Sequence, residues 1–86
     1  MKLLYFWAEW CEPCKVLSPI VDELKSEGYN VEKVEQMDIT PEQAATYHIM
    51  SVPTMVFLEE TGEIENITNS VMTKQQIISK LTPERS

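Results

Sequence analysis

Two cysteines at the junction of two hydrophobic patterns constrain the fold of this chain more than any other feature. Residues 2–8 form a short apolar run rich in aromatic side chains, a pattern typical of a strand buried on both faces. After Cys11 and Cys14, apolar residues recur at helical spacing until Gly28, which predicts an amphipathic helix over residues 13–26. The cysteines are therefore expected where a buried strand passes into a helix.

Turn and capping signals divide the rest of the chain into further elements. In chain order we expect a strand at residues 31–39, a helix at 40–48, strands at 54–58 and 64–68, and a helix from residue 73 that Thr82 and Pro83 end. Capping boxes begin both of these helices, and charged residues mark the strand at 31–39 as an edge strand. The order β-α-β-α-β-β-α predicts an α/β architecture: a parallel strand pair extended by an antiparallel hairpin into a four-stranded mixed sheet with helices on both faces. We expect a single domain over residues 1–86, because a chain of this length is too short for two cores.

The charge balance limits the partners of this chain. Fourteen acidic residues against seven basic ones give a net charge of −7, which repels phosphate backbones and anionic lipid head groups. No apolar run approaches the ~20 residues of a membrane-spanning helix, and no cleavable signal precedes the first strand. We therefore expect a cytoplasmic protein that binds neither nucleic acid nor membrane.

The cysteines themselves indicate chemistry, because a disulfide that closes so short a loop stabilises a fold only weakly. At a helix N-terminus, unpaired backbone N–H groups and the helix dipole favour a thiolate, so Cys11 is the expected nucleophile. Cys14 lies one turn further and is expected to be more buried, and to attack the mixed disulfide that Cys11 forms with a substrate. A closed zinc site needs four ligands, whereas the chain offers two thiols and His48 as its one imidazole. A metal ion or cluster shared between two chains is the alternative; we expect no bound metal or cofactor.

The residues around the cysteines resemble the active-site strand and helix of thioredoxins. The resemblance lies in the run Phe6-Trp7-Ala8-Glu9-Trp10-Cys11-Glu12-Pro13-Cys14-Lys15, in Pro19 and in Asp22-Glu23. Residues 51–54, Ser-Val-Pro-Thr, resemble the second signature of that family, in which a cis proline lies beside the two sulfurs. The resemblance implies a thioredoxin-like fold and a thiol-disulfide oxidoreductase that reduces protein disulfides through Cys11 and Cys14. It also implies a thioredoxin-reductase-type electron donor, and we expect a monomer.

The same resemblance implies a substrate-binding surface. In thioredoxins the backbone before the cis proline pairs with an extended substrate segment, and a glycine-containing loop flanks the site. Residues 69–71, Asn-Ser-Val, fall where that loop lies, and asparagine is a mild substitution for its glycine because asparagine tolerates a positive φ better than most residues. The expected substrate-binding residues are Trp10, Glu12, Pro13, Val52, Pro53, Asn69, Ser70 and Val71.

Three features depart from the thioredoxin pattern. The first strand begins at residue 2, without the strand and helix that usually precede it, as in a compact, glutaredoxin-sized version. Tyr5 stands where thioredoxins place a buried Asp, and Glu12 replaces a glycine, which predicts a more reducing cysteine couple. Two alternatives stay open. One is a glutaredoxin-type, glutathione-dependent reductase, although the segment after Pro53 lacks a Gly-Gly-Asp-like stretch; the other is a non-catalytic docking module with a thioredoxin fold.

Overall fold

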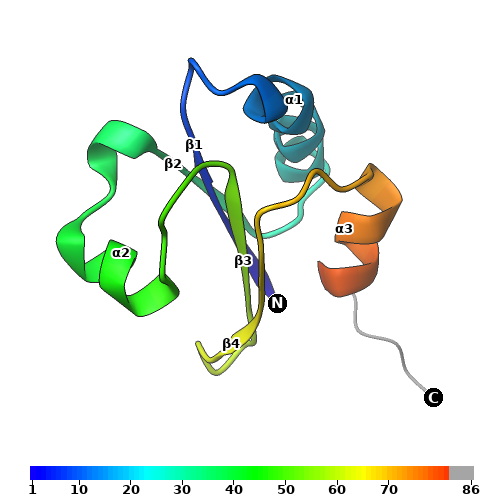
Figure 1. Cartoon of the computed structure of the whole chain (residues 1–86). Helices are drawn as coiled ribbons and strands as arrows, with labels where there is room; N and C mark the ends of the chain where they lie inside the picture. The colour runs from blue at the N-terminus through cyan, green and yellow to red at the C-terminus, as the bar shows by residue number, and fades with distance from the viewer. Residues whose placement is uncertain (82–86) are drawn as a thin grey trace.

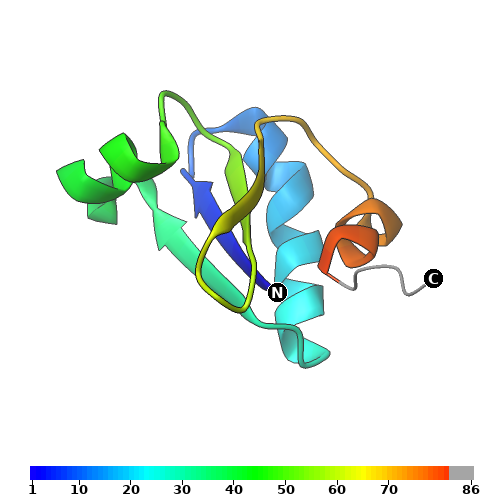
Figure 2. The ribbon, with the colours of Figure 1, turned by 90° about the horizontal axis from the view of Figure 1, so that it is seen from below.

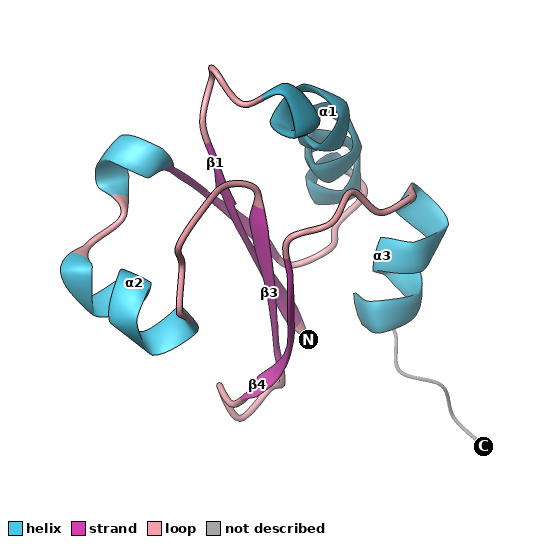
Figure 3. Cartoon of the chain, in the orientation of Figure 1, coloured by secondary structure: helices cyan, strands magenta, loops and turns pink. Residues whose placement is uncertain are grey.

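The elements follow the predicted order in a computed structural model that describes residues 1–81 (Figure 1). They are, in chain order, β1 (Lys2–Trp7), α1 (Glu12–Ser26), β2 (Val31–Glu35), the short 3₁₀ helix η1 (Gln36–Asp38), α2 (Pro41–Tyr47), β3 (Thr54–Leu58), β4 (Ile64–Thr68) and α3 (Lys74–Leu81). The end predicted for the last helix, at Thr82 and Pro83, lies outside the described residues. Figure 3 shows how the loops join these elements.

The strands form the expected four-stranded mixed sheet, in the order β2-β1-β3-β4. β1 pairs in parallel with β2 and antiparallel with β3, and β4 returns antiparallel to β3. β2 is therefore an edge strand, as its charged residues predicted. Ion pairs join these residues to neighbouring elements, from Lys33 to Asp22 at 2.8 Å and from Lys2 to Glu32 at 2.9 Å.

Helices cover both faces of the sheet. α1 and α3 lie on one face and α2 lies on the other, as the two views show (Figure 1 and Figure 2). Alternate residues of β1 enter the two cores: Leu3 and Tyr5 pack toward α1 and α3, whereas Leu4 and Phe6 belong to the cluster that includes Tyr47 of α2. β1 is thus buried on both faces, as its continuous apolar run predicted.

Both predicted capping boxes form. Thr40 Oγ1 accepts the Gln43 backbone N–H at 3.1 Å, and the Gln43 side chain accepts the Thr40 N–H at 3.0 Å. Thr73 and Gln76 repeat the two bonds at the start of α3, at 3.1 and 2.9 Å. His48 caps the other end of α2 with a left-handed backbone, φ 54°.

The second strand is shorter than the expected 31–39. β2 ends at Glu35, and the chain turns into η1. The reason is its partner: Glu35 lies opposite Trp7, the last residue of β1, so residues beyond Glu35 have no strand beside them. Met37 consequently projects into solvent with 83% of its surface exposed.

Candidate active site

The two cysteines lie where β1 passes into α1, as predicted. Cys11 has extended backbone angles and is the N-cap of α1, and its sulfur accepts the Cys14 backbone N–H at 3.3 Å. The Cα atoms are 5.2 Å apart and the two sulfurs are joined as a disulfide. A sulfur in this position receives an N–H bond and lies at the positive end of the helix dipole, both of which favour a thiolate when the disulfide is reduced.

The disulfide is recessed into the protein. The exposed fraction is 3% for Cys11 and 1% for Cys14, so the expected difference in burial between them is small in this oxidised form. They pack with Ala8 and with the partly buried Trp7 and Val52. A reacting group must therefore enter between the surrounding side chains to contact Cys11.

Residues from three segments lie next to the cysteines, in sequence or in space. Trp10 is 67% exposed, and Pro13 is also exposed at the start of α1. Val52 is half-buried, and its peptide bond to the buried Pro53 is cis. The structure thus brings the cis-proline segment to the cysteines, since Val52 contacts their cluster.

Glu12 points away from the core and pairs with a cation. Its carboxylate lies 3.1 Å from Lys15 Nζ, and both side chains are largely exposed. This ion pair partly neutralises the negative charge next to Cys11. The influence of Glu12 on the cysteine couple is therefore smaller than that of an unpaired carboxylate.

Asn69 plays a different part from the one expected. Among residues 1–81, His48 is the one non-glycine residue with a positive φ, so Asn69 does not adopt the left-handed backbone. Its side-chain amide instead donates to Thr54 Oγ1 at 2.8 Å and to the Pro53 carbonyl at 3.3 Å. The loop at 69–71 is thereby tied to the cis-proline segment through a side chain.

A largely apolar groove with a volume of about 440 Å³ lies beside Trp10 and Val52, and neither cysteine lines it. Its lining residues are Trp10, Gln36, Ile39, Ile49, Met50, Ser51 and Val52. Met50, one of these lining residues, is 93% exposed. Sequence reasoning named Trp10 and Val52 but missed Ile39, Ile49 and Met50. The signal for Ile49 and Met50 was their position just before the proline signature, and Ile39 had none.

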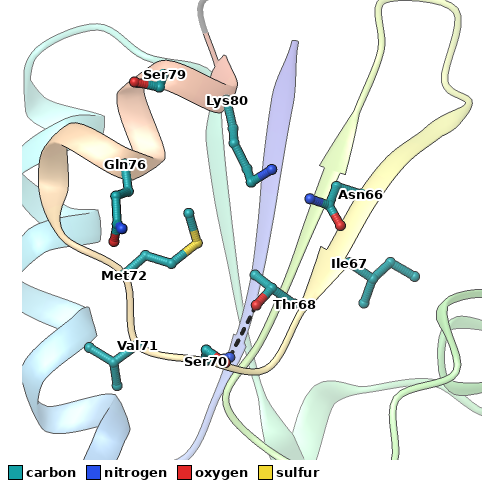
Figure 4. A pocket seen from close by; sticks show the side chains of 9 residues that line it. All are labelled: Asn66, Ile67, Thr68, Ser70, Val71, Met72, Gln76, Ser79 and Lys80. Carbon is teal, nitrogen blue, oxygen red and sulfur yellow. Dashed lines mark hydrogen bonds between the residues drawn. The ribbon is translucent and has the colours of Figure 1, made fainter.

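The expected loop residues Ser70 and Val71 line a different hollow, of about 590 Å³, between β4 and α3. Figure 4 shows it, with Lys80 reaching from α3 toward Asn66 of β4. The Ser70 backbone N–H donates to Thr68 Oγ1 at 3.2 Å. The predicted surface is thus divided: Trp10 and Val52 share the groove, whereas Ser70 and Val71 do not line it.

Tyr5 lies fully buried beneath the first turn of α1. Its hydroxyl lies 3.3 Å from the Cys14 carbonyl oxygen and 3.0 Å from Ser18 Oγ. Burial raises the pKa of Tyr5 above its ordinary 10.0, the bond with Ser18 opposes that rise, and the Asp22 charge adds to it. The group beneath the disulfide is therefore neutral near neutral pH.

No metal-binding cluster of three or more His, Cys, Asp or Glu residues occurs within residues 1–81. In the same part of the chain, every helix is too short or too polar to cross a bilayer.

A mixed sheet covered by helices, with a dithiol at the N-terminus of the first helix and a proline loop beside it, defines a thioredoxin-fold dithiol protein. The family model for thioredoxin matches residues 1–83, and the chain belongs to the thioredoxin family. A thioredoxin of Staphylococcus epidermidis is 32% identical over 69 residues, which cover 78% of this chain and 66% of that protein. The bifunctional thioredoxin reductase/thioredoxin of Mycobacterium leprae is 34% identical over 70 residues, 79% of this chain and 15% of that protein.

A solved structure gives the same result for the fold. A mutant thioredoxin from Halobacterium salinarum NRC-1 superimposes with a TM-score of 0.78 at 27% identity, covering 98% of this chain and 76% of that one. The chain thus spans slightly less than two thirds of the length of the curated thioredoxin and a small part of the bifunctional protein.

Proposed function

We propose that this protein is a thiol-disulfide oxidoreductase that reduces protein disulfides through Cys11 and Cys14. The observation that carries the proposal is the position of the disulfide: Cys11 is the N-cap of α1, and its sulfur accepts the Cys14 N–H at 3.3 Å. Membership of the thioredoxin family supports it.

The reaction proceeds in two exchanges. In the reduced protein, the Cys11 thiolate attacks one sulfur of a substrate disulfide, forms a mixed disulfide and releases the other substrate sulfur as a thiolate. The Cys14 thiolate then attacks Cys11 Sγ, which restores the Cys11–Cys14 disulfide and releases the second substrate thiolate. Two electrons pass to the substrate, and an external dithiol must return them before the next turnover.

The substrate is an extended segment of a protein. A recessed disulfide excludes a flat surface, whereas a narrow segment can enter between Trp10, Pro13 and Val52. The apolar groove beside Trp10 would take an aliphatic or aromatic side chain of that segment, and the Val52 backbone would pair with it. We assign substrate binding to Trp10, Glu12, Pro13, Val52, Pro53, Asn69, Ser70 and Val71, with Asn69 acting through Pro53 and Thr54.

The electron donor is a reductase of the thioredoxin-reductase type. The Mycobacterium leprae relative is named as a bifunctional thioredoxin reductase/thioredoxin, which joins such a donor to a similar domain in one chain. We further propose that the protein works as a monomer in the cytoplasm and needs no bound metal or cofactor.

Trapping the mixed disulfide tests the proposal. A Cys14→Ser variant should remain covalently linked to a disulfide-containing protein such as insulin, and dithiothreitol should release it. A Cys11→Ser variant, the matched control, should form no such adduct and should not reduce insulin. A Cys11→Ser, Cys14→Ser double variant with full biological activity would instead support a docking module.

The donor separates the two reductase classes. We expect turnover with NADPH and a thioredoxin reductase, and little turnover with glutathione and glutathione reductase. The reverse result would support the glutaredoxin-type alternative.

A further inference from the structure

The hydroxyl of Tyr5 is held in a directed chain of hydrogen bonds. A backbone carbonyl can only accept, so the single Tyr5 O–H proton is donated to the Cys14 carbonyl oxygen, 3.3 Å away. In the hydrogen bond between Tyr5 and Ser18, at 3.0 Å, the Ser18 hydroxyl must then be the donor and the Tyr5 oxygen the acceptor. This series of hydrogen bonds runs from Ser18 to Tyr5 to the backbone of Cys14, and it joins β1 to the first two turns of α1.

This part of α1 lacks one of its own hydrogen bonds. Pro19 lies inside the helix and has no N–H, so the carbonyl of Lys15 receives no bond from four residues ahead. The turn that carries Cys14 is therefore held less firmly by the helix itself. While the disulfide is closed, the covalent bond to Cys11 fixes Cys14; once it opens, that restraint is lost.

We propose that Tyr5 is a positioning residue for Cys14: it holds the first turn of α1 against β1 so that Cys14 Sγ stays within reach of Cys11 Sγ during the second exchange. This role rests on the proposed function. Because Tyr5 stays protonated near neutral pH, it is not the base that takes the proton of Cys14.

A chromogenic disulfide, dithiobis(nitrobenzoate), separates the two exchanges. Cys11 attacks it and releases one thionitrobenzoate in a phase whose rate rises with reagent concentration. Cys14 then attacks Cys11 Sγ and releases the second thionitrobenzoate in a phase that does not depend on that concentration. Stopped-flow absorbance on the reduced full chain records both phases.

Tyr5→Phe keeps the aromatic ring and removes the hydroxyl. We expect the first phase to change less than twofold and the second to slow about fivefold, the equivalent of one hydrogen bond of ~1 kcal/mol. Ser18→Ala is the matched control: it leaves the Tyr5 bond to the Cys14 carbonyl intact, so its second phase should stay within about twofold of the parent. A purely structural role would lower thermal stability in Tyr5→Phe without this split between the two phases.

Pro19→Ala supplies a second test. It restores the backbone N–H that can donate to the Lys15 carbonyl, and so stabilises the same turn of the helix. Combined with Tyr5→Phe, Pro19→Ala should restore most of the rate of the second phase. It should also restore folding if the single variant is unstable. An unchanged second phase in Tyr5→Phe, or no recovery in the double variant, overturns the role of Tyr5. Absence of the first phase in the parent overturns the proposed function instead.

Discussion

Removing the side chain of Asn69 should loosen the loop at 69–71 from the cis-proline segment. Asn69 donates to Thr54 Oγ1 at 2.8 Å and to the Pro53 carbonyl at 3.3 Å. Thr54 is fully buried and uses its own O–H to donate to the Ser51 carbonyl. Without Asn69, the remaining lone pairs of the Thr54 oxygen lose their partner inside the protein.

The expected cost of Asn69→Ala follows from these two bonds. A partly buried hydrogen bond contributes about 0.5 to 1.5 kcal/mol, and the longer one contributes near the lower end. We expect a loss of about 1.5 kcal/mol in the free energy of unfolding, which for a domain of this size lowers Tm by roughly 6 to 12 °C. Because the loop flanks the proposed site, KM for a protein disulfide should rise while kcat changes little.

Urea unfolding followed by circular dichroism, together with insulin-reduction kinetics, measures both effects. Ser70→Ala is the matched control, since Ser70 uses its backbone N–H to bond Thr68 and this bond survives the substitution. Asn69→Asp should cost more than Asn69→Ala, because a carboxylate would face the Pro53 carbonyl with no proton to donate. If Asn69→Ala loses less than about 0.5 kcal/mol and keeps its KM, the tether assigned to this side chain is wrong.

Three further perturbations test the core, the charge beside Cys11 and the alkaline limit. Leu17→Ala empties a fully buried position between α1 and the sheet and should cost about 2 to 5 kcal/mol in urea unfolding; a loss below about 1 kcal/mol would contradict the packing. Glu12→Gln should raise the redox potential by only about 10 mV, because the carboxylate is exposed and paired, and Lys15→Gln should lower it; equilibration with glutathione detects a contrary sign. Since the pKa of Tyr5 is raised in the folded protein, its contribution to the free energy of unfolding is constant below pH ~10 and falls as pH rises further. Tyr5→Phe should therefore lose stability less steeply at alkaline pH. An equally steep loss in the variant and the parent would refute the assignment.

Local patterns in the sequence predicted most of the fold because the signals there are short-range. The two capping boxes each depend on residues three positions apart, and both form with the expected bonds. The end of β2 depends instead on a residue far along the chain. Glu35 is its last residue because its partner Trp7 ends β1, and nothing in residues 31–39 specifies where a neighbouring strand stops.

The candidate site divides in the same way. Cys11 and Cys14 could be placed from sequence, since a strand, a helix start and their own spacing fix them. Asn69 could not be understood from sequence, because its amide bonds Thr54 and Pro53, which are 15 and 16 residues away. Met50 was missed for a related reason: its exposure follows from the path of the chain between α2 and β3 and not from its residue type.

The neutral core beneath the disulfide has a consequence for how pH acts on this protein. Tyr5 stays protonated near neutral pH and adds no charge beneath the disulfide. The carboxylate nearest in sequence to Cys11 is that of Glu12, which is exposed and paired with Lys15. Charges at the surface act on a recessed sulfur through solvent and are screened by salt. The pH dependence of the second exchange should therefore reflect mainly the two thiols, and any contribution of the surface charges should shrink at high ionic strength. Replacing Tyr5 by Asp would add a buried titrating group, and a second inflection should then enter the pH profile of that step.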